Sequence, residues 1–218
     1  MIKLLNSKYN LFYLLLFFSV NLRVSIILID VYFLDNFLSQ NDSIGFHLTA
    51  LDRLDVFKAY MWAIDNNVHF FTTPDLLQFS DRHYYPLLLS FFYWLFSGEY
   101  LIGVSCSLFF WIINLYFLKK ILDYISNNYL INNLALILFC FLPSSILFST
   151  LILRESLQAL LLVIILFYSL IFYYERKTYT LLIILLSFFI LFLSHAVYLF
   201  IGLAYVFVLL RLFFLKLY

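Results

Sequence analysis

The residues that could carry out chemistry are concentrated in one stretch, residues 35–99, which holds eight of the twelve acidic side chains and three of the four histidines. Asp42 stands near its start and is followed five positions later by His47. A carboxylate in this position can take a proton from an acceptor hydroxyl or bind a divalent metal. Asp is also a common helix N-cap, so capping is the alternative. Asp42 is the candidate catalytic base, and His47 is a candidate substrate-binding residue.

A second polar group precedes Pro86 and contains Arg82, His83, Tyr84 and Tyr85. Pro suits the first position of a helix, so a helix is expected to begin here. Cationic side chains and free backbone N–H groups at a helix start can hold a phosphate. Arg82, His83 and Tyr85 are therefore candidate substrate-binding residues. The alternative is a belt of interfacial aromatic residues beside a charge that extends to water.

Two further polar sites interrupt the apolar second half of the chain. Arg154 and Glu155 stand between two apolar segments, where ionisable residues are costly and invite a functional interpretation. An ordinary interfacial pair at a turn is the alternative. His195 either lines an outward-facing cavity or marks a turn. Arg23 lies inside the first apolar segment and is expected to extend to the interface or to pair across a helix bundle, with Asp30 as one candidate partner.

Composition excludes several classes of protein. A net charge of +1 argues against a nucleic-acid partner, which would need a basic patch. Cys106 and Cys140 lie in apolar segments and lack the spacing of a disulfide or metal pair, so both are expected to be packing residues. No set of metal ligands is predicted, and a divalent metal at Asp42 is the only cofactor that the pattern leaves open.

The elements that must position these residues belong to a membrane protein. The chain is 66% hydrophobic and only 11% charged, whereas soluble domains carry about 25% charged residues. Its 218 residues leave room for about six spans of roughly 20 residues each and one large loop. Lys3 and Lys8 precede an apolar run without a small-residue cleavage site, so the first segment is expected to be a retained helix rather than a signal peptide.

Six apolar segments are predicted to cross the bilayer. The last two are divided at Ser194-His195, because about 32 apolar residues are too long for one span. The predicted fold is an all-α, polytopic membrane helix bundle that forms one domain over residues 1–218. The predicted spans are residues 11–34, 100–118, 133–153, 156–174, 179–193 and 196–210.

The large loop over residues 35–99 is predicted to contain two interfacial helices. Residues 44–64 carry apolar side chains at helical spacing, which indicates an amphipathic helix on the membrane surface. A second helix is expected from Pro86 to Phe96, too short to span a bilayer. The apolar residues of the first helix are Leu48, Leu51, Leu54 and Phe57.

The distribution of Lys and Arg predicts the orientation. With a cytoplasmic N-terminus, eight of these residues fall on the cytoplasmic side and four on the opposite side. Lys and Arg accumulate on the cytoplasmic side of membrane proteins, so both termini are expected to be cytoplasmic. The cytoplasmic group is Lys3, Lys8, Lys119, Lys120, Arg176, Lys177, Arg211 and Lys216, and the opposite group is Arg53, Lys58, Arg82 and Arg154.

In layout, the chain resembles the GT-C superfamily of membrane glycosyltransferases, and within it the bacterial relatives of protein mannosyltransferases and lipid A aminoarabinose transferases. One shared feature is the outer loop after the first span, in which an acidic residue, Asp42, is followed by an aromatic residue and His47. Another is the short helix beginning at residues 85–89, a gap at 97–99, and a span ending in Lys119-Lys120. The third is the stretch 149–157, which is similar to the outer turn before the fourth helix.

This resemblance implies transfer of a sugar from a polyprenyl-phosphate donor to an acceptor on the non-cytoplasmic face of the cell (inner) membrane. It places the catalytic carboxylate of the family at Asp42 and its phosphate-binding residues at Arg82, His83 or Arg154. The carboxylate would deprotonate the acceptor while cations stabilise the departing lipid phosphate.

The chain departs from this family in length. Members usually have more than six spans, and many have a soluble C-terminal domain, whereas this chain ends at Tyr218. The expectation is a truncated copy, a fragment or a subunit that needs a membrane-protein partner, which leaves enzyme activity open. Three other functions stay open: a polysaccharide polymerase, a transporter fragment, and a non-catalytic scaffold of envelope polysaccharide assembly. Against a transporter, only Pro143 lies well inside a span and no repeat is evident.

Overall fold

The computed structural model of the chain describes residues 10–34, 41–65, 84–195 and 197–215. These residues form the helices α2 to α10 and no strand, which confirms the all-α prediction for the described part of the chain. Three helices are long and apolar enough to cross a membrane: α2 (Asn10–Phe33), α5 (Tyr100–Ile125) and α8 (Arg154–Glu175). In α9 (Tyr179–Ser194) and α10 (Val197–Leu215) the apolar stretches found are shorter, so the count of six spans stays a prediction.

The third predicted span is not one continuous helix. It consists of α6 (Tyr129–Phe141) and α7 (Pro143–Thr150), which meet at a bend of 52°. Proline has no N–H to donate, and its ring clashes with the carbonyl four residues earlier, so the helix is interrupted before Pro143. The two helices are long enough to span a membrane only when taken together, as a broken span or a re-entrant loop.

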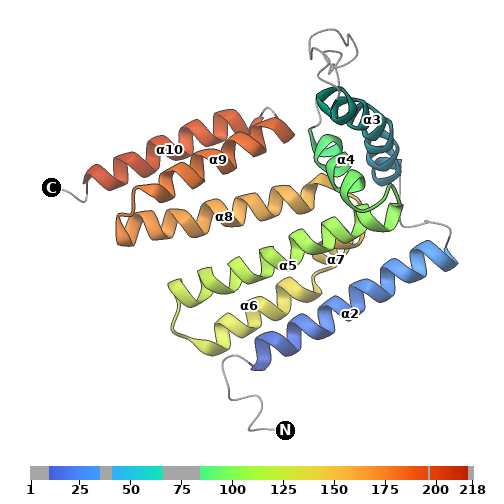
Figure 1. Ribbon diagram of the computed structural model, residues 1–218. Coiled ribbons are helices and arrows are strands. Elements are labelled where there is room, and N and C mark those ends of the chain that lie inside the picture. The colour runs from blue at the N-terminus through green and yellow to red at the C-terminus, as the bar shows by residue number, and fades with distance from the viewer. Residues whose placement is uncertain (1–9, 35–40, 66–83, 196, 216–218) are drawn as a thin grey trace.

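The apolar helices lie side by side in the order α2, α6, α5, α8, α9 and α10 (Figure 1). The start of α2 and the end of α10 lie at the same end of this array as the α5–α6 and α8–α9 turns. Two more helices, α3 (Asn41–Asp65) and α4 (Tyr85–Leu95), lie at the opposite end. Helices are therefore present at both places where the first loop was expected to contain one, and Pro86 stands at the start of α4 as predicted. Their position at a membrane surface stays a prediction.

The helix α3 packs against α4 through part of the predicted face, with Leu54 buried and Leu51 partly buried. Ala50 and Leu54 are buried, and the Phe46 ring meets the Tyr85 ring edge-on at 5.3 Å between centroids. Leu48, expected on the same apolar face, is exposed. Helical spacing alone therefore does not determine which side chains of α3 are buried, because the contact with α4 also decides it.

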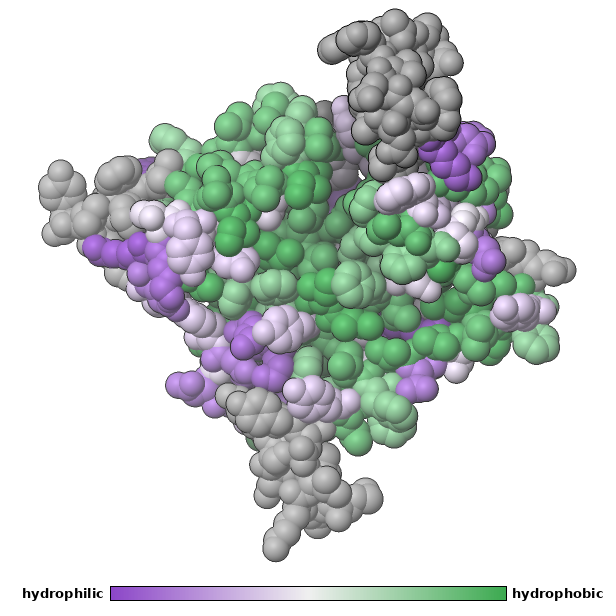
Figure 2. Space-filling model, viewed as in Figure 1, coloured by the Kyte–Doolittle hydropathy of each residue, from purple (hydrophilic) through white to green (hydrophobic). Residues whose placement is uncertain are grey.

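The surface of the array carries many large apolar side chains. Figure 2 shows apolar residues over the middle of this face, with hydrophilic residues gathered toward its edges. Such a surface is unfavourable in water but suits contact with acyl chains. More than half of the following side chains is exposed: Phe17, Phe109, Leu134, Leu182, Leu203 and Phe207.

Candidate functional site

The start of α3 is held against two distant parts of the chain by Ser43. Its hydroxyl lies 2.9 Å from the Tyr100 hydroxyl and accepts a hydrogen bond of 3.0 Å from the backbone N–H of Ile152. Ile152 belongs to the turn between α7 and α8, and Tyr100 begins α5. This contact joins the start of α3 to the turn that leads into Arg154 and Glu155.

Asp42, the candidate catalytic base, is the residue before Ser43 and the second residue of α3. Its backbone is helical, but its side chain lies outside the described part of the structure. The choice between a cap and a catalytic base therefore stays a prediction. Arg82 and His83 also lie outside the described residues.

His47 lies in a cluster of tyrosines rather than in a basic site. Its Nδ1 atom shares a hydrogen bond of 2.7 Å with the Tyr93 hydroxyl, and its ring meets the Tyr93 and Tyr100 rings edge-on. Burial lowers the pKa of His47 below its usual 6.5 and raises the pKa of Tyr93. Both groups are neutral near pH 7, so the cluster offers hydrogen bonds and ring faces but no positive charge.

Tyr85 is a buried residue and not part of an exposed aromatic belt. Only 2% of it is exposed, whereas its neighbour Tyr84 is exposed. Burial raises the pKa of its hydroxyl. Within the described residues the Tyr85 hydroxyl has no hydrogen-bond partner, and neither has the Ser107 hydroxyl on α5 or Oε2 of Glu155 on α8.

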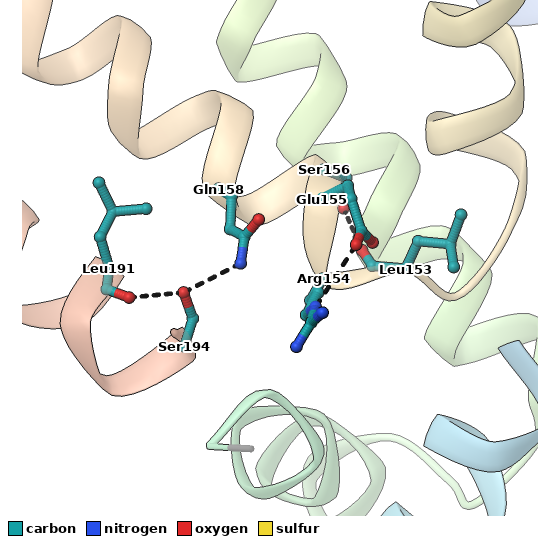
Figure 3. Close-up of polar contacts among 7 residues, drawn as sticks. All are labelled: Leu153, Arg154, Glu155, Ser156, Gln158, Leu191 and Ser194. Atoms are coloured by element: carbon teal, nitrogen blue, oxygen red, sulfur yellow. Dashed lines mark hydrogen bonds and ion pairs between the residues drawn. The ribbon is translucent and has the colours of Figure 1, made fainter. Parts of the chain in front are cut away.

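Arg154 and Glu155 form the first turn of α8 and pair with each other, with 3.4 Å between Arg154 Nε and Glu155 Oε1 (Figure 3). Side-chain exposures of 24% and 37% leave both groups partly accessible. A cation is unfavourable at a helix N-terminus, where the helix dipole is positive. The adjacent carboxylate of Glu155 offsets this repulsion. The pair gives this end of the array a cation and a carboxylate that an external ligand can reach.

His195 lies in the turn between α9 and α10. It is exposed, it caps the end of α9, and its Nδ1 atom accepts a hydrogen bond of 3.4 Å from the Val197 N–H. This placement agrees with the turn alternative. Beside it, Gln158 Nε2 donates a hydrogen bond of 3.1 Å to the Ser194 hydroxyl, which ties α8 to the end of α9 (Figure 3).

Arg23 does not extend to the interface, as one expectation held, but is fully buried and binds across the bundle. Its guanidinium lies 3.6 Å from the centre of the Trp111 ring. It also donates four hydrogen bonds of 2.7–3.2 Å. The acceptors are the hydroxyls of Ser145 and Ser149 and the carbonyls of Ser19 and Cys140.

The structure thus places His47, Tyr85, Arg154 and Glu155 at the α3–α4 end of the array, and the α9–α10 turn that contains His195 lies at the same end (Figure 1). Sequence reasoning missed four residues of this cluster, because a hydroxyl inside an apolar helix carries no motif and 18 tyrosines are spread along the chain. Within the described residues, no three His, Cys, Asp or Glu side chains come together in a way that could hold a metal. The missed residues are Ser43, Tyr93, Tyr100 and Ser107.

Comparison of the chain with protein-family models, with curated proteins and with solved structures finds no match. Nothing in these comparisons tests the resemblance to membrane glycosyltransferases, so the function rests on the arrangement of residues described above.

Proposed function

We propose that the chain is a multi-pass protein of the cell membrane, with both termini cytoplasmic, that binds a polyprenyl-phosphate sugar at its outer face as a glycosyltransferase-like protein. The observation that supports this proposal is the hydrogen bond between Ser43 and the Ile152 amide. It brings the candidate base in the first outer loop close to the candidate phosphate-binding cation at the start of α8.

The backbone path through this contact limits how far apart the two groups lie. Asp42 is one residue from Ser43, and Arg154 is two residues from Ile152. With about 3.8 Å between consecutive Cα atoms and a 3.0 Å hydrogen bond, the two Cα atoms lie within about 20 Å of each other. The long Arg154 side chain and a substrate of several ring widths can bridge such a distance.

A lipid-linked donor suits the apolar surface beside this site. The helix α4 and its C-cap residue Phe96 expose an apolar surface next to the buried tyrosines of the cluster, formed by Phe91, Trp94, Leu95 and Phe96. A polyprenyl chain in the membrane could lie along these side chains while its phosphate reaches the aqueous edge. Aromatic side chains at a membrane boundary favour this placement, because their rings tolerate both environments.

In the proposed reaction, Asp42 takes the proton from the acceptor hydroxyl as the acceptor oxygen bonds to the anomeric carbon of the sugar. The bond from that carbon to the phosphate oxygen breaks, and the electron pair leaves with the lipid phosphate. Arg154 stabilises the negative charge of the phosphate as it departs.

Photo-crosslinking of the purified chain to a polyprenyl-phosphate probe, with polyprenyl-phosphate sugars as competitors, tests the donor site. Arg154→Ala should weaken saturable labelling about 10- to 100-fold, since a hydrogen bond to a charged group contributes about 1.5–3 kcal/mol. Arg211→Ala, on the exposed surface of α10, is the control and should not change labelling. Labelling no stronger than that of an unrelated membrane protein would contradict the proposed donor site.

Asp42→Asn separates an enzyme from a binding protein. The variant should keep the labelling, because the base acts on the acceptor, and should lose turnover of the lipid-linked sugar in membranes supplied with envelope extract. Saturable labelling without turnover in the wild-type chain would favour a non-catalytic subunit of envelope polysaccharide assembly.

A further inference from the structure

The helix α2 lies at one edge of the array and packs against α5, α6 and α7 through one side (Figure 1). This side is buried and carries Arg23 with its hydrogen bonds to α6 and α7. The opposite side is exposed at six positions that are separated alternately by four and three residues. We refer to these positions as the α2 seam: Leu14, Phe18, Asn21, Ser25, Leu28 and Tyr32.

The spacing of the α2 seam suits contact with another helix. Apolar residues at alternating intervals of four and three keep one face of a helix against a second helix over many turns. The seam extends over about 27 Å at a rise of about 1.5 Å per residue, close to the thickness of a bilayer core of about 30 Å. Leu, Phe and Tyr side chains suit acyl chains equally well, so this spacing alone does not decide between a helix and lipid.

Asn21 decides between them. It is the twelfth of the 24 residues of α2, so in a helix that crosses the membrane it lies near the middle of the hydrocarbon core. Its Nδ2 atom donates one hydrogen bond of 2.8 Å to the Phe17 carbonyl of the same helix. Within the described residues, its Oδ1 atom and its second amide hydrogen have no partner. Acyl chains offer neither a donor nor an acceptor, so such a group is costly until another protein segment pairs with it.

A second copy of the chain supplies the missing partner at the right depth. Two copies in one membrane have the same orientation, because the charges of the chain determine it. A two-fold axis along the membrane normal then sets the two α2 helices parallel and brings each seam residue opposite its own counterpart. The carboxamide of Asn21 is self-complementary, since it carries both N–H donors and a C=O acceptor. Each Asn21 can therefore donate to the Oδ1 atom of the other.

We propose that the chain forms a parallel homodimer in the membrane through the α2 seam, with the Asn21 side chains of the two copies hydrogen-bonded to each other near the middle of the bilayer. Ser25, one turn further along the seam, has a small side chain that lets the two helices approach closely. The helix α8, which begins with Arg154, is separated from α2 by α5 and α6 (Figure 1). The dimer is therefore independent of the proposed donor site.

Association of the full chain in lipid vesicles tests the role of Asn21. Energy transfer between donor- and acceptor-labelled chains is measured as the vesicles are diluted with lipid. Asn21→Leu should need a protein-to-lipid ratio about tenfold higher for half-maximal transfer, because it removes the interhelical hydrogen bonds of the amide pair. Asn21→Gln keeps a carboxamide and should retain most of the association. Phe207→Leu, at an exposed position of α10 on the other edge of the array, is the control and should leave transfer unchanged.

Disulfide crosslinking in membranes locates the interface. With Cys106 and Cys140 replaced by alanine, Ser25→Cys should give a disulfide-linked dimer under a mild oxidant, whereas Phe207→Cys should not. Asn21→Leu changes an exposed side chain of the monomer and should leave its thermal unfolding temperature in detergent unchanged, which separates lost association from lost folding.

Three results would overturn the homodimer. The first is absence of energy transfer in the wild-type chain at every protein-to-lipid ratio. The second is equal association of Asn21→Leu and the wild-type chain. The third is crosslinking of Ser25→Cys to a different protein and not to a second copy, which would assign the α2 seam to that protein.

Discussion

At the scale of single residues, Arg23 shows how an arginine is accommodated inside an apolar bundle. A buried charge is costly unless its hydrogen bonds are made, and the guanidinium makes four. One acceptor is the Cys140 carbonyl, in the last turn of α6, where carbonyls lack partners within the helix. Another is Ser149 of α7. Arg23 therefore connects α2 to both halves of the bent α6–α7 pair.

Arg23→Lys should destabilise the protein although it keeps the charge. An ammonium cannot reproduce the planar fork of donors or the stacking on Trp111, and a hydrogen bond to a charged group contributes about 1.5–3 kcal/mol. We expect a loss of at least about 2 kcal/mol in the free energy of unfolding in detergent. Arg211→Lys, at an exposed position, is the control. Equal stability of the two variants would show that the hydrogen bonds of Arg23 do not hold the bend.

His47 predicts a pH dependence for the docking of α3. Its pKa is lowered in the folded state by burial, so the unfolded state binds more protons as the pH falls. Its contribution to stability is complete above pH 6.5 and is lost as the pH drops through the lower, folded-state pKa. Amide exchange of α3, corrected for intrinsic rates, should be faster at pH 5.5 than at pH 7.5.

His47→Gln provides the check on this pH effect. Glutamine has no ionisable group and can still bond to the Tyr93 hydroxyl, so the difference between the two pH values should shrink. An unchanged difference would assign the pH effect to another group.

At the scale of helices, close packing around Gly103 of α5 holds α4, α5 and the α7–α8 turn together. A Cβ atom at Gly103 would lie 2.5 Å from the Tyr93 hydroxyl and 2.6 Å from Cδ1 of Ile152. These distances are shorter than any real Cβ contact, so a side chain at this position must push its neighbours away. Tyr93 bonds to His47 and Ile152 bonds to Ser43, so α5 at Gly103 supports both contacts of α3.

Gly103→Ala should therefore destabilise the protein, although alanine has a higher helix propensity than glycine. Overpacking in a core costs about 1–3 kcal/mol. The matched control is Gly45→Ala, where no atom lies within 4 Å of the new Cβ, and this variant should be stabilised by about 0.5–1 kcal/mol. Thermal unfolding of both variants in detergent measures the difference, and stabilisation by both would contradict the packing described here.

At the scale of the whole molecule, the ends of the helix array differ in charge. Lys119, Lys120, Arg176 and Lys177 lie toward the end where α2 begins and α10 ends, and α3 and α4 lie at the other end (Figure 1). In the orientation predicted from the positive charges, the first of these ends faces the cytoplasm.

Cysteine labelling of intact cells tests this orientation. With the buried Cys106 and Cys140 replaced by alanine, single cysteines are placed at exposed positions of either end. A membrane-impermeant maleimide should label Glu99→Cys from outside, whereas Lys120→Cys and Arg176→Cys should react only after permeabilisation. Labelling of all three positions from outside would contradict the predicted crossing of the membrane by α5 and the cytoplasmic position of the α5–α6 and α8–α9 turns.

Much of the helix layout follows from the sequence alone. Runs of apolar residues predict where the long helices lie, and Pro86 and the Ser194-His195 interruption predict where α4 begins and α9 ends. Pro143 is visible in the sequence, but the bend it introduces became evident only in the structure. Helix formation is local, so its signals lie within a few residues of their effect.

Only the tertiary structure decided which polar residues meet. Ser43 and Ile152 are 109 residues apart, and Arg23 and Ser149 are 126 apart. Each pair is a single hydrogen bond between otherwise ordinary positions of the chain, and no periodicity or spacing in one sequence encodes it. The same reason explains why Tyr85, expected to bind substrate or to join an interfacial aromatic belt, is buried: burial depends on the helices that pack around a residue, not on its neighbours in the chain.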